Sequence, residues 1–303
     1  MWSSTDIPDQ AGRVALITGG YSGIGLVTAR ELAARDATVV IAGRDRERAA
    51  AVAGELGGWP LHLDLGDIGS VRRASGEFRD RFGRLDLLVN NAGLMIPPYG
   101  RTVSGFEWQF GVNHLGHFAL TGLLLDVLRA TPEARVVTVS SNGHKGAVID
   151  FEDLQSERGY DAMRAYQQSK LANLLFAFEL QRRHPELISV AAHPGAARTR
   201  LMRSSPWVFR AVVSQRTKAL FSWLIQSEWA GAQPVLRAAT DPGVGGGEYF
   251  GPDGWKEFTG RATRVTAEEN AHDLVVARRL WVVSEGLTGV TYPAGAGMLA
   301  DGP

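Results

Sequence analysis

A tyrosine and a lysine four residues apart are the first candidates for proton chemistry in this chain of 303 residues. Tyr166 and Lys170 stand in the run YQQSK, inside a stretch of helical periodicity that we expect to form a helix over 160–183. Residues four apart share one helix face, with about 5–6 Å between their Cβ atoms. A lysine charge there favours tyrosinate, so we expect the pKa of Tyr166 to fall below its usual value of about 10. The alternative is a solvated pair on a helix surface.

A glycine-rich loop near the start of the chain could cradle phosphates. It reads TGGYSGIG over residues 18–25, between an apolar run at 14–17 and a helical pattern at 24–35. Gly19, Gly23 and Gly25 would permit a tight turn, a close approach of the backbone to a pyrophosphate, and close packing of helix on strand. The free amides and the positive end of the helix would then face the phosphates. A plain glycine-rich connector is the alternative, which the flanking strand and helix disfavour.

Strand and helix patterns alternate along the chain in the way typical of a parallel sheet with helices on both faces. The expected strands are 14–17, 37–42, 61–64, 85–89, 135–139, 187–192 and 248–250. The expected helices are 24–35, 45–56, 67–82, 106–128, 160–183, one from 227, and one over 266–283 that begins with a capping box of Thr266 and Glu269. The sequence therefore predicts a doubly wound α/β fold of about seven strands, in a single domain over 1–303.

Composition excludes several classes of function. Lys plus Arg equals Asp plus Glu, 32 each, so nucleic acid and anionic membranes are poor candidate partners. The sequence has no cysteine, which excludes disulfides and thiol catalysis. We find neither a signal peptide pattern nor a run of about 18 apolar residues. We therefore expect a cytoplasmic protein without an integral membrane segment.

The glycine spacing G-x-x-x-G-x-G after a threonine, followed by Y-x-x-x-K, resembles the short-chain dehydrogenase/reductase family. The sequences of the segments VNHLGHF, YQQSKLANLLF and HPG are most similar to those of the family's subgroup of retinol dehydrogenases and their bacterial relatives. The resemblance implies a Rossmann-type fold and hydride transfer to or from a nicotinamide cofactor. It implies that Tyr166 is the general acid/base and that Lys170 also holds the nicotinamide ribose. Ser141 would orient the substrate oxygen, and Asn113 would hold a water in the proton relay; a turn-forming serine and a structural asparagine are the alternatives.

The same resemblance surrounds the cofactor with further residues. Asp64 would contact adenine, NNAG would lie beside the adenosine ribose, and HPG would lie near the carboxamide. At the end of the second strand Gly43 takes the place of the acidic residue of NAD-preferring sites, and Arg44 follows, so we expect NADP(H) to be preferred over NAD(H); a surface arginine is the alternative. The predicted cofactor-binding residues are Thr18, Gly19, Tyr21, Ser22, Gly23, Ile24, Gly25, Arg44, Asp64, Leu65, Asn91, Ala92, Gly93, Tyr166, Lys170, Pro194, Gly195 and Thr199.

The C-terminal third contains an aromatic stretch at 199–226, where the family places its variable substrate lid. We predict a lid that closes on bound substrate, with Met95 and Ile96 on the opposite wall. Core packing, a subunit contact and an interfacial amphipathic helix remain alternatives. The segment 255–303 is read as a C-terminal extension. The aromatic and apolar residues behind the lid prediction are Trp207, Phe209, Phe221, Trp223, Leu224 and Ile225.

These observations predict an NADP(H)-dependent oxidoreductase that interconverts a carbonyl and an alcohol on a small, largely apolar substrate. A homo-oligomer is compatible with the sequence. We expect no metal, because the histidines at 114, 117, 144 and 193 match no ligand spacing. One rival is a non-catalytic NADP-sensing or scaffold protein on the same fold. Another is an extended-type epimerase or dehydratase, whose glycine spacing T-G-x-x-G-x-x-G differs from this loop.

Overall fold

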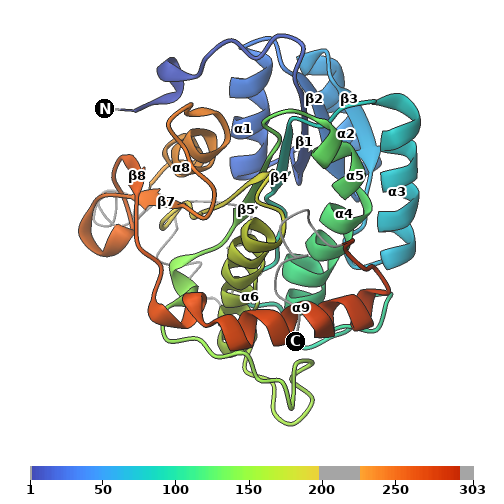
Figure 1. Cartoon of the computed structure of the whole chain (residues 1–303), viewed down its shortest axis with the longest axis vertical. Helices are drawn as coiled ribbons and strands as arrows, with labels where there is room; N and C mark the ends of the chain where they lie inside the picture. Colours follow the sequence, from blue (N-terminus) through green and yellow to red (C-terminus); the bar gives the residue numbers. More distant parts are fainter. Residues whose placement is uncertain (1, 198–225, 294–303) are drawn as a thin grey trace, which may run out of the picture.

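One eight-stranded sheet runs through the chain (Figure 1). The computed structural model describes residues 2–197 and 226–293. The strand order is β3-β2-β1-β4-β5-β6-β7-β8, and neighbours are parallel except β7 with β8. This order reverses direction between β1 and β4, as in doubly wound folds, and confirms the predicted fold class. The strands are β1 Val14–Thr18, β2 Thr38–Gly43, β3 Trp59–His62, β4 Leu87–Asn90, β5 Arg135–Val139, β6 Ile188–Ala192, β7 Tyr249–Pro252 and β8 Ala262–Arg264.

Helices cover both faces of the sheet (Figure 1). Alternate residues of β1 point to opposite layers: Ala15 and Ile17 pack with α1, α2 and α8, while Val14 and Leu16 pack with α3, α4 and α5. Burial on both faces explains why this strand is apolar throughout. The helix α6 lies on the second face and α9 packs against it. The helices are α1 Gly23–Ala33, α2 Arg46–Leu56, α3 Ile68–Arg81, α4 Gly116–Leu123, α5 Leu125–Ala130, α6 Ala162–Arg183, α8 Glu228–Thr240 and α9 Leu274–Thr288.

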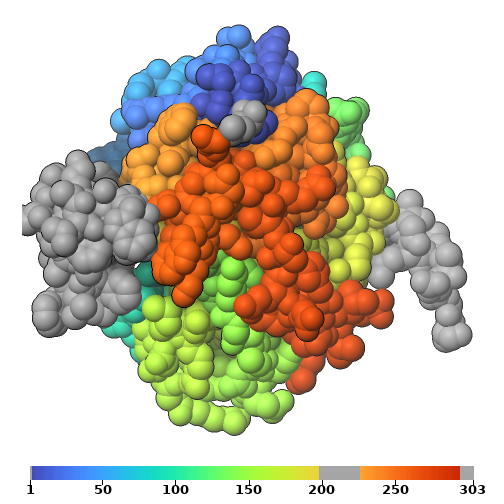
Figure 2. Space-filling model, turned by 90° about the vertical axis from the view of Figure 1, so that its left-hand side faces the viewer, coloured from blue at the N-terminus to red at the C-terminus, as the bar shows by residue number. Residues whose placement is uncertain are grey.

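The strand β8 corrects the prediction of about seven strands. It has three residues and pairs antiparallel with β7 at the edge of the sheet, through pairs such as Gly251 with Thr263. A segment this short carries no readable alternation of polar and apolar residues, so only the pairing partner defines it. Figure 2 shows the orange residues that run from α8 to β8 spread over the centre of this face.

The predicted start of the last helix was wrong. Thr266 and Glu269 do not cap it; instead α9 begins after Asp273, whose Oδ1 accepts the amides of Val275 and Val276 at 2.9 Å each. The preceding residues are held by distant loop contacts, since Asn270 Nδ2 donates to the carbonyl of Ala147 at 2.9 Å. These residues form only a short 3-10 turn, η6 Glu269–His272.

The long helix expected over 106–128 is divided into segments. Before Trp108 the chain forms a turn and not a helix: Arg101 bridges Glu107, and Phe106 O accepts the amide of Thr102 at 2.7 Å. A π-helical turn, η2 Phe110–Leu115, then precedes α4, and Leu124 at φ −105° and ψ 6° separates α4 from α5. Single π turns inside helices often mark functional sites, and this one carries Asn113.

The proposed lid at 199–226 and the predicted cofactor residue Thr199 lie outside the described residues, apart from Gln226. At that residue an isolated bridge pairs Ala197 with Gln226. Within 2–197 and 226–293, no helix is both long enough and apolar enough to cross a membrane.

Candidate active site

Polar side chains gather where the parallel strands end. Thr18 closes β1, Asn91 follows β4, Ser141 follows β5 and Pro194 follows β6. In a parallel sheet these carboxyl ends share one edge, and ligands of doubly wound folds bind outside that edge where the strand order reverses. The fold therefore brings together residues that lie far apart in the sequence.

The glycine loop adopts the close-packed geometry that the sequence predicted. Gly19 and Gly23 have positive φ angles of 66° and 56°, which glycine adopts without strain. A Cβ at Gly25 would lie 2.5 Å from Asn91 Nδ2 and 2.6 Å from Gly19 O, so no larger residue fits. Ser22 precedes the first turn of α1, and its side chain makes no capping bond there. The amides at this helix start are thus open to an anion.

Thr18 is the centre of a buried hydrogen-bond network. Its Oγ1 accepts the amides of Asn91 and Ala92 at 2.9 Å each and lies 2.9 Å from His117 Nε2. The other ring nitrogen, Nδ1, donates to the carbonyl of Asn113 at 2.9 Å. Burial lowers the pKa of His117 to about 4, so the ring is neutral and Nε2 is an acceptor for the Thr18 hydroxyl. The network joins the glycine loop, the NNAG loop and η2.

Burial raises the pKa of Tyr166, and a hydrogen bond with the side chain of Ser141, which lies beside the tyrosine hydroxyl, offsets only part of that rise. Ser141 also caps the 3-10 turn η3 Asn142–His144, since its Oγ accepts the amide of Gly143 at 3.1 Å. The neighbouring Ser140 points the other way and donates to the carbonyl of Lys170 at 2.7 Å. The second serine of the pair therefore faces the tyrosine, and the first holds α6 against β5.

The expected lowering of the Tyr166 pKa by Lys170 is not what the structure gives. Burial raises the pKa of Tyr166 and outweighs the opposite effect of Ser141. The ammonium of Lys170 lies 5.7 Å from the centre of the tyrosine ring and donates to the carbonyl of Val139 at 3.2 Å. Burial of this side chain, which is 5% exposed, lowers the pKa of Lys170 to about 8. Tyr166 is thus protonated at neutral pH, and Lys170 is a cation only below about pH 8.

Asn113 is fully buried and its amide group is occupied by protein partners. Its Oδ1 accepts the amide of Leu94 at 2.7 Å, and its Nδ2 donates to the carbonyl of Leu94 and to Ser169 Oγ at 3.0 and 2.9 Å. Gly93 passes so close that a Cβ there would lie 3.1 Å from Oδ1 and 3.7 Å from Lys170 Nζ. Asn113 therefore fixes the NNAG loop against the helix that carries Tyr166.

The loop after β3 approaches the same edge. Asp64 Oδ1 accepts the amide of Gly66 at 2.9 Å, and among the described residues Oδ2 has no hydrogen-bond partner. Leu65 is buried, and a Cβ at Gly116 would lie 2.4 Å from its carbonyl oxygen. The glycine of VNHLGHF thus lets the start of α4 contact this loop directly.

At the end of β2 a side chain of the glycine loop lies against Gly43, and Arg44 follows. Tyr21 lies over Gly43, where a Cβ would be 2.1 Å from Tyr21 Cε1. Arg44 is exposed and makes no ion pair with another described residue. An acidic side chain at position 43 would first have to displace the Tyr21 ring.

The loop after β6 closes the site on the other side. Gly195 has a φ of 61°, and a Cβ there would meet Phe258 O at 2.4 Å. The carbonyl of Pro194 accepts from Gln226 Nε2 at 2.6 Å. The buried Ile24 of α1 lies on the same side, since a Cβ built at Gly231 of α8 would be 3.3 Å from Pro194 O and 3.4 Å from Ile24 Cδ1.

Comparison with known proteins agrees with this geometry. The family model of the short chain dehydrogenases matches residues 13–206. The chain is 41% identical to human retinol dehydrogenase 13 over 296 residues (93% of this chain, 86% of the relative), and 40% identical to mouse polyprenol dehydrogenase over 302 residues (93% and 86%). The chain belongs to the short-chain dehydrogenase family. The sequence-based resemblance, including its retinol-dehydrogenase-like subgroup, is thereby confirmed.

Two solved structures are also similar to this chain. A crystal structure of a Mycobacterium paratuberculosis protein superposes with a TM-score of 0.79 at 41% identity, covering 96% of this chain and 99% of that one. A complex of Pseudomonas aeruginosa RhlG with NADP in its active site superposes with a TM-score of 0.65 at 26% identity, covering 79% and 94%.

Two features of the site were not predicted from the sequence. For His117 the sequence favoured packing or a local hydrogen bond over a metal site, but it did not identify Thr18 and Asn113 as the partners, although the place of His117 four residues after Asn113 puts both on one helix face. Glu257, described below, lies beyond the residues that match the family model, and nothing in its local sequence marks it. Among the described residues, no group of His, Cys, Asp and Glu is arranged to hold a metal ion.

Proposed function

We propose that the protein is an NADP(H)-dependent oxidoreductase that interconverts a carbonyl and an alcohol on a small, largely apolar substrate. The observation that carries the proposal is the meeting of the Ser141 and Tyr166 hydroxyls beside the buried Lys170 ammonium. Such a group can bind a carbonyl oxygen and deliver a proton to it.

The chain's own residues then have separate roles. Tyr166 donates its proton to the substrate oxygen, for which its raised pKa keeps it protonated at neutral pH. Ser141 donates to the same oxygen and orients it. Lys170 uses one of its three N–H groups on Val139 O, and the others are available to ribose hydroxyls. Asn113 supports the proton relay by holding the loop at Gly93 and Leu94 in place. The bound nicotinamide supplies or accepts the hydride.

The described residues fit a dinucleotide. The glycine cradle at 19–25 leaves room for a pyrophosphate at the start of α1, and Asp64 and the NNAG loop border the adenosine side. Preference for NADP(H) rests on Arg44, whose exposed guanidinium can pair with a 2′-phosphate, and on Gly43, which adds no negative charge. The NADP complex of RhlG supports the same choice.

An apolar substrate is supported by the relatives, whose names include retinol and polyprenol dehydrogenases. The two alternative functions, a cofactor sensor or scaffold and an extended-type epimerase or dehydratase, have less support. A cofactor sensor or scaffold does not need Ser141, Tyr166 and Lys170 in one place. The glycine spacing does not match the extended epimerases and dehydratases. A cytoplasmic location, a homo-oligomer and a lid at 199–226 stay predictions.

The test is a screen of ketones, aldehydes and alcohols that follows the absorbance of reduced nicotinamide. It should include long-chain apolar alcohols and the matching aldehydes, each with NADP(H) and NAD(H). We expect turnover of apolar members with NADP(H), and none in Tyr166→Phe. Tight NADPH binding without turnover of any compound would favour the sensor reading instead.

A further inference from the structure

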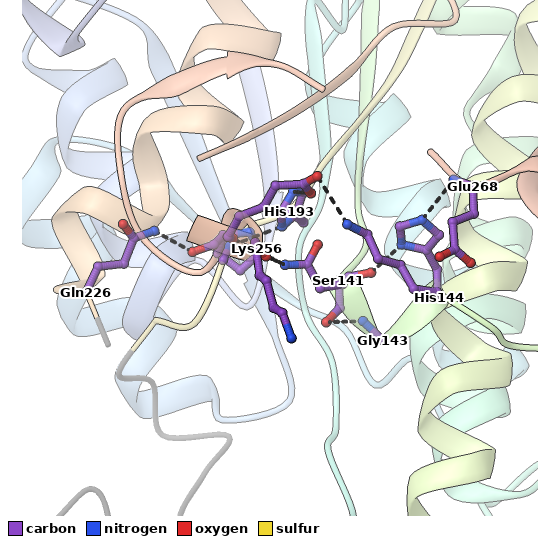
Figure 3. Close-up of polar contacts among 12 residues, drawn as sticks. Ser141, Gly143, His144, His193, Gln226, Lys256 and Glu268 are labelled. Atoms are coloured by element: carbon purple, nitrogen blue, oxygen red, sulfur yellow. Dashed lines mark hydrogen bonds and ion pairs between the residues drawn. The ribbon is translucent and has the colours of Figure 1, made fainter. Parts of the chain in front are cut away.

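A turn in the C-terminal extension lies between the two loops that form the reaction site. The turn follows β7 and contains η5 Trp255–Glu257. One neighbouring loop follows β5 and carries Ser141; the other follows β6 and carries Pro194 and Gly195. Figure 3 shows Lys256 of this turn between Gln226 on one side and Ser141 on the other.

The turn is bonded to the Ser141 loop by two residues. Asn142 Nδ2, next to the serine, donates to the carbonyls of Lys256 and Glu257 at 3.0 and 3.2 Å. Lys145 Nζ donates to Glu257 Oε1 at 3.1 Å. These contacts enclose the short turn η3, which Ser141 caps.

The turn is also bonded to the loop after β6. The amide of Ala196 donates to the carbonyl of Phe258 at 2.7 Å. His193, which is fully buried, accepts the amide of Gly195 on Nδ1 at 3.3 Å, so the proton is on Nε2. His193 Nε2 lies 3.1 Å from Glu257 Oε2, but the N–H does not point at this oxygen closely enough to form a hydrogen bond. The contact is therefore mainly the attraction of the ring dipole to the carboxylate charge.

Glu257 thus divides its two carboxylate oxygens between the two loops. Contacts with His193 and Lys145 lower the pKa of Glu257, so it is ionised at neutral pH. Its side chain is 23% exposed, which protects these contacts from full screening by water. Lys256 and Glu257 both have positive φ angles, 49° and 57°, which cost energy in residues other than glycine. The surrounding bonds hold the turn in this conformation.

We propose that Glu257 is a positioning residue that sets the spacing between the Ser141 loop and the Pro194–Gly195 loop. This inference rests on the proposed function, in which Ser141 holds the substrate oxygen and the loop after β6 borders the nicotinamide. Hydride transfer needs donor and acceptor carbons in a narrow range of distance, and a misplacement of about 1 Å can lower the rate roughly 100-fold. The residues proposed to hold the phosphates, ribose and adenine belong to other segments, so we expect overall NADPH affinity to depend little on this turn.

The experiment compares Glu257→Ala, Glu257→Gln and Lys145→Met with the wild type. The control is Glu152→Ala, which removes an exposed ion pair with Arg279 of α9 and not one with the turn at 255–257. In Glu257→Ala we expect kcat to fall roughly 10- to 100-fold, with NADPH affinity unchanged. The isotope effect with NADPH deuterated at the transferred position should increase, because hydride transfer becomes slower than product release. Glu257→Gln keeps the side-chain volume and one oxygen, so its kcat and isotope effect should lie between those of the wild type and those of Glu257→Ala.

A merely structural role predicts a different pattern. It would lower the thermal unfolding temperature and the fraction of active protein, but leave kcat per active site and the isotope effect at wild-type values. That result in Glu257→Ala overturns the proposal while the proposed function stands. If no substrate turns over, the fluorescence enhancement of bound NADPH reports how firmly the nicotinamide is held. Enhancement equal to wild type in Glu257→Ala again overturns the proposal, whereas failure of the wild type to bind NADPH overturns the proposed function as well.

Discussion

Removal of the Arg44 guanidinium should change cofactor choice more than any other single substitution at the surface. A charge-assisted bond of this kind contributes about 1.5–3 kcal/mol. Arg44 is exposed, so screening reduces this to about 1–2 kcal/mol. Because about 1.4 kcal/mol is tenfold in Kd, Arg44→Ala should weaken NADPH binding roughly 5- to 30-fold. NADH lacks the 2′-phosphate, and its affinity should stay the same.

Fluorescence titration of both nucleotides measures this difference. The matched control is Arg30→Ala, which removes an exposed arginine of α1 that pairs with Glu55 of α2 at 2.9 Å. Gly43→Asp provides the opposite perturbation, since it adds a negative charge at the end of β2 and must displace the Tyr21 ring. It should favour NADH strongly. An unchanged ratio of NADPH to NADH affinity in Arg44→Ala would refute the assignment of this residue.

The other predictions concern Tyr166, Lys170 and Asn113. Tyr166→Phe should abolish turnover in the nicotinamide absorbance assay while NADPH titration stays normal; near wild-type turnover would contradict its role as proton donor. The pKa of Lys170 is lowered to about 8, so the ammonium is present below that pH and NADPH affinity should fall as pH rises through it. Titrations from pH 6.5 to 9.5 should lack this step in Lys170→Met, and a wild type without the step would count against the assignment. Asn113→Ala leaves the Leu94 backbone groups unpaired, so the free energy of unfolding should fall by about 1–3 kcal/mol in denaturant melts; Asn173→Ala, which loses a single bond to Val139 O, is the comparison.

The sequence by itself determined how most strands and helices follow one another along the chain. Strands that are buried on both faces of a parallel sheet are apolar throughout, so the apolar run at 14–17 could be recognised as such a strand from the sequence alone. The glycine loop was readable because only glycine tolerates the positive φ at positions 19 and 23. Tyr166 and Lys170 lie on one helix, so their spacing also predicted their proximity.

Tertiary structure alone decided the features that depend on distant partners. The strand β8 forms because it can pair with the edge strand β7. The helix α9 starts only after Asp273 because the preceding residues bond to the loop near His144 and Ala147. The pKa of Tyr166 rises rather than falls, because burial is set by the packing around α6 and not by the lysine four residues away. Glu257 reaches Lys145 and His193 only after the chain has folded, since a carboxylate far along the sequence carries no local sign of the two loops that it joins.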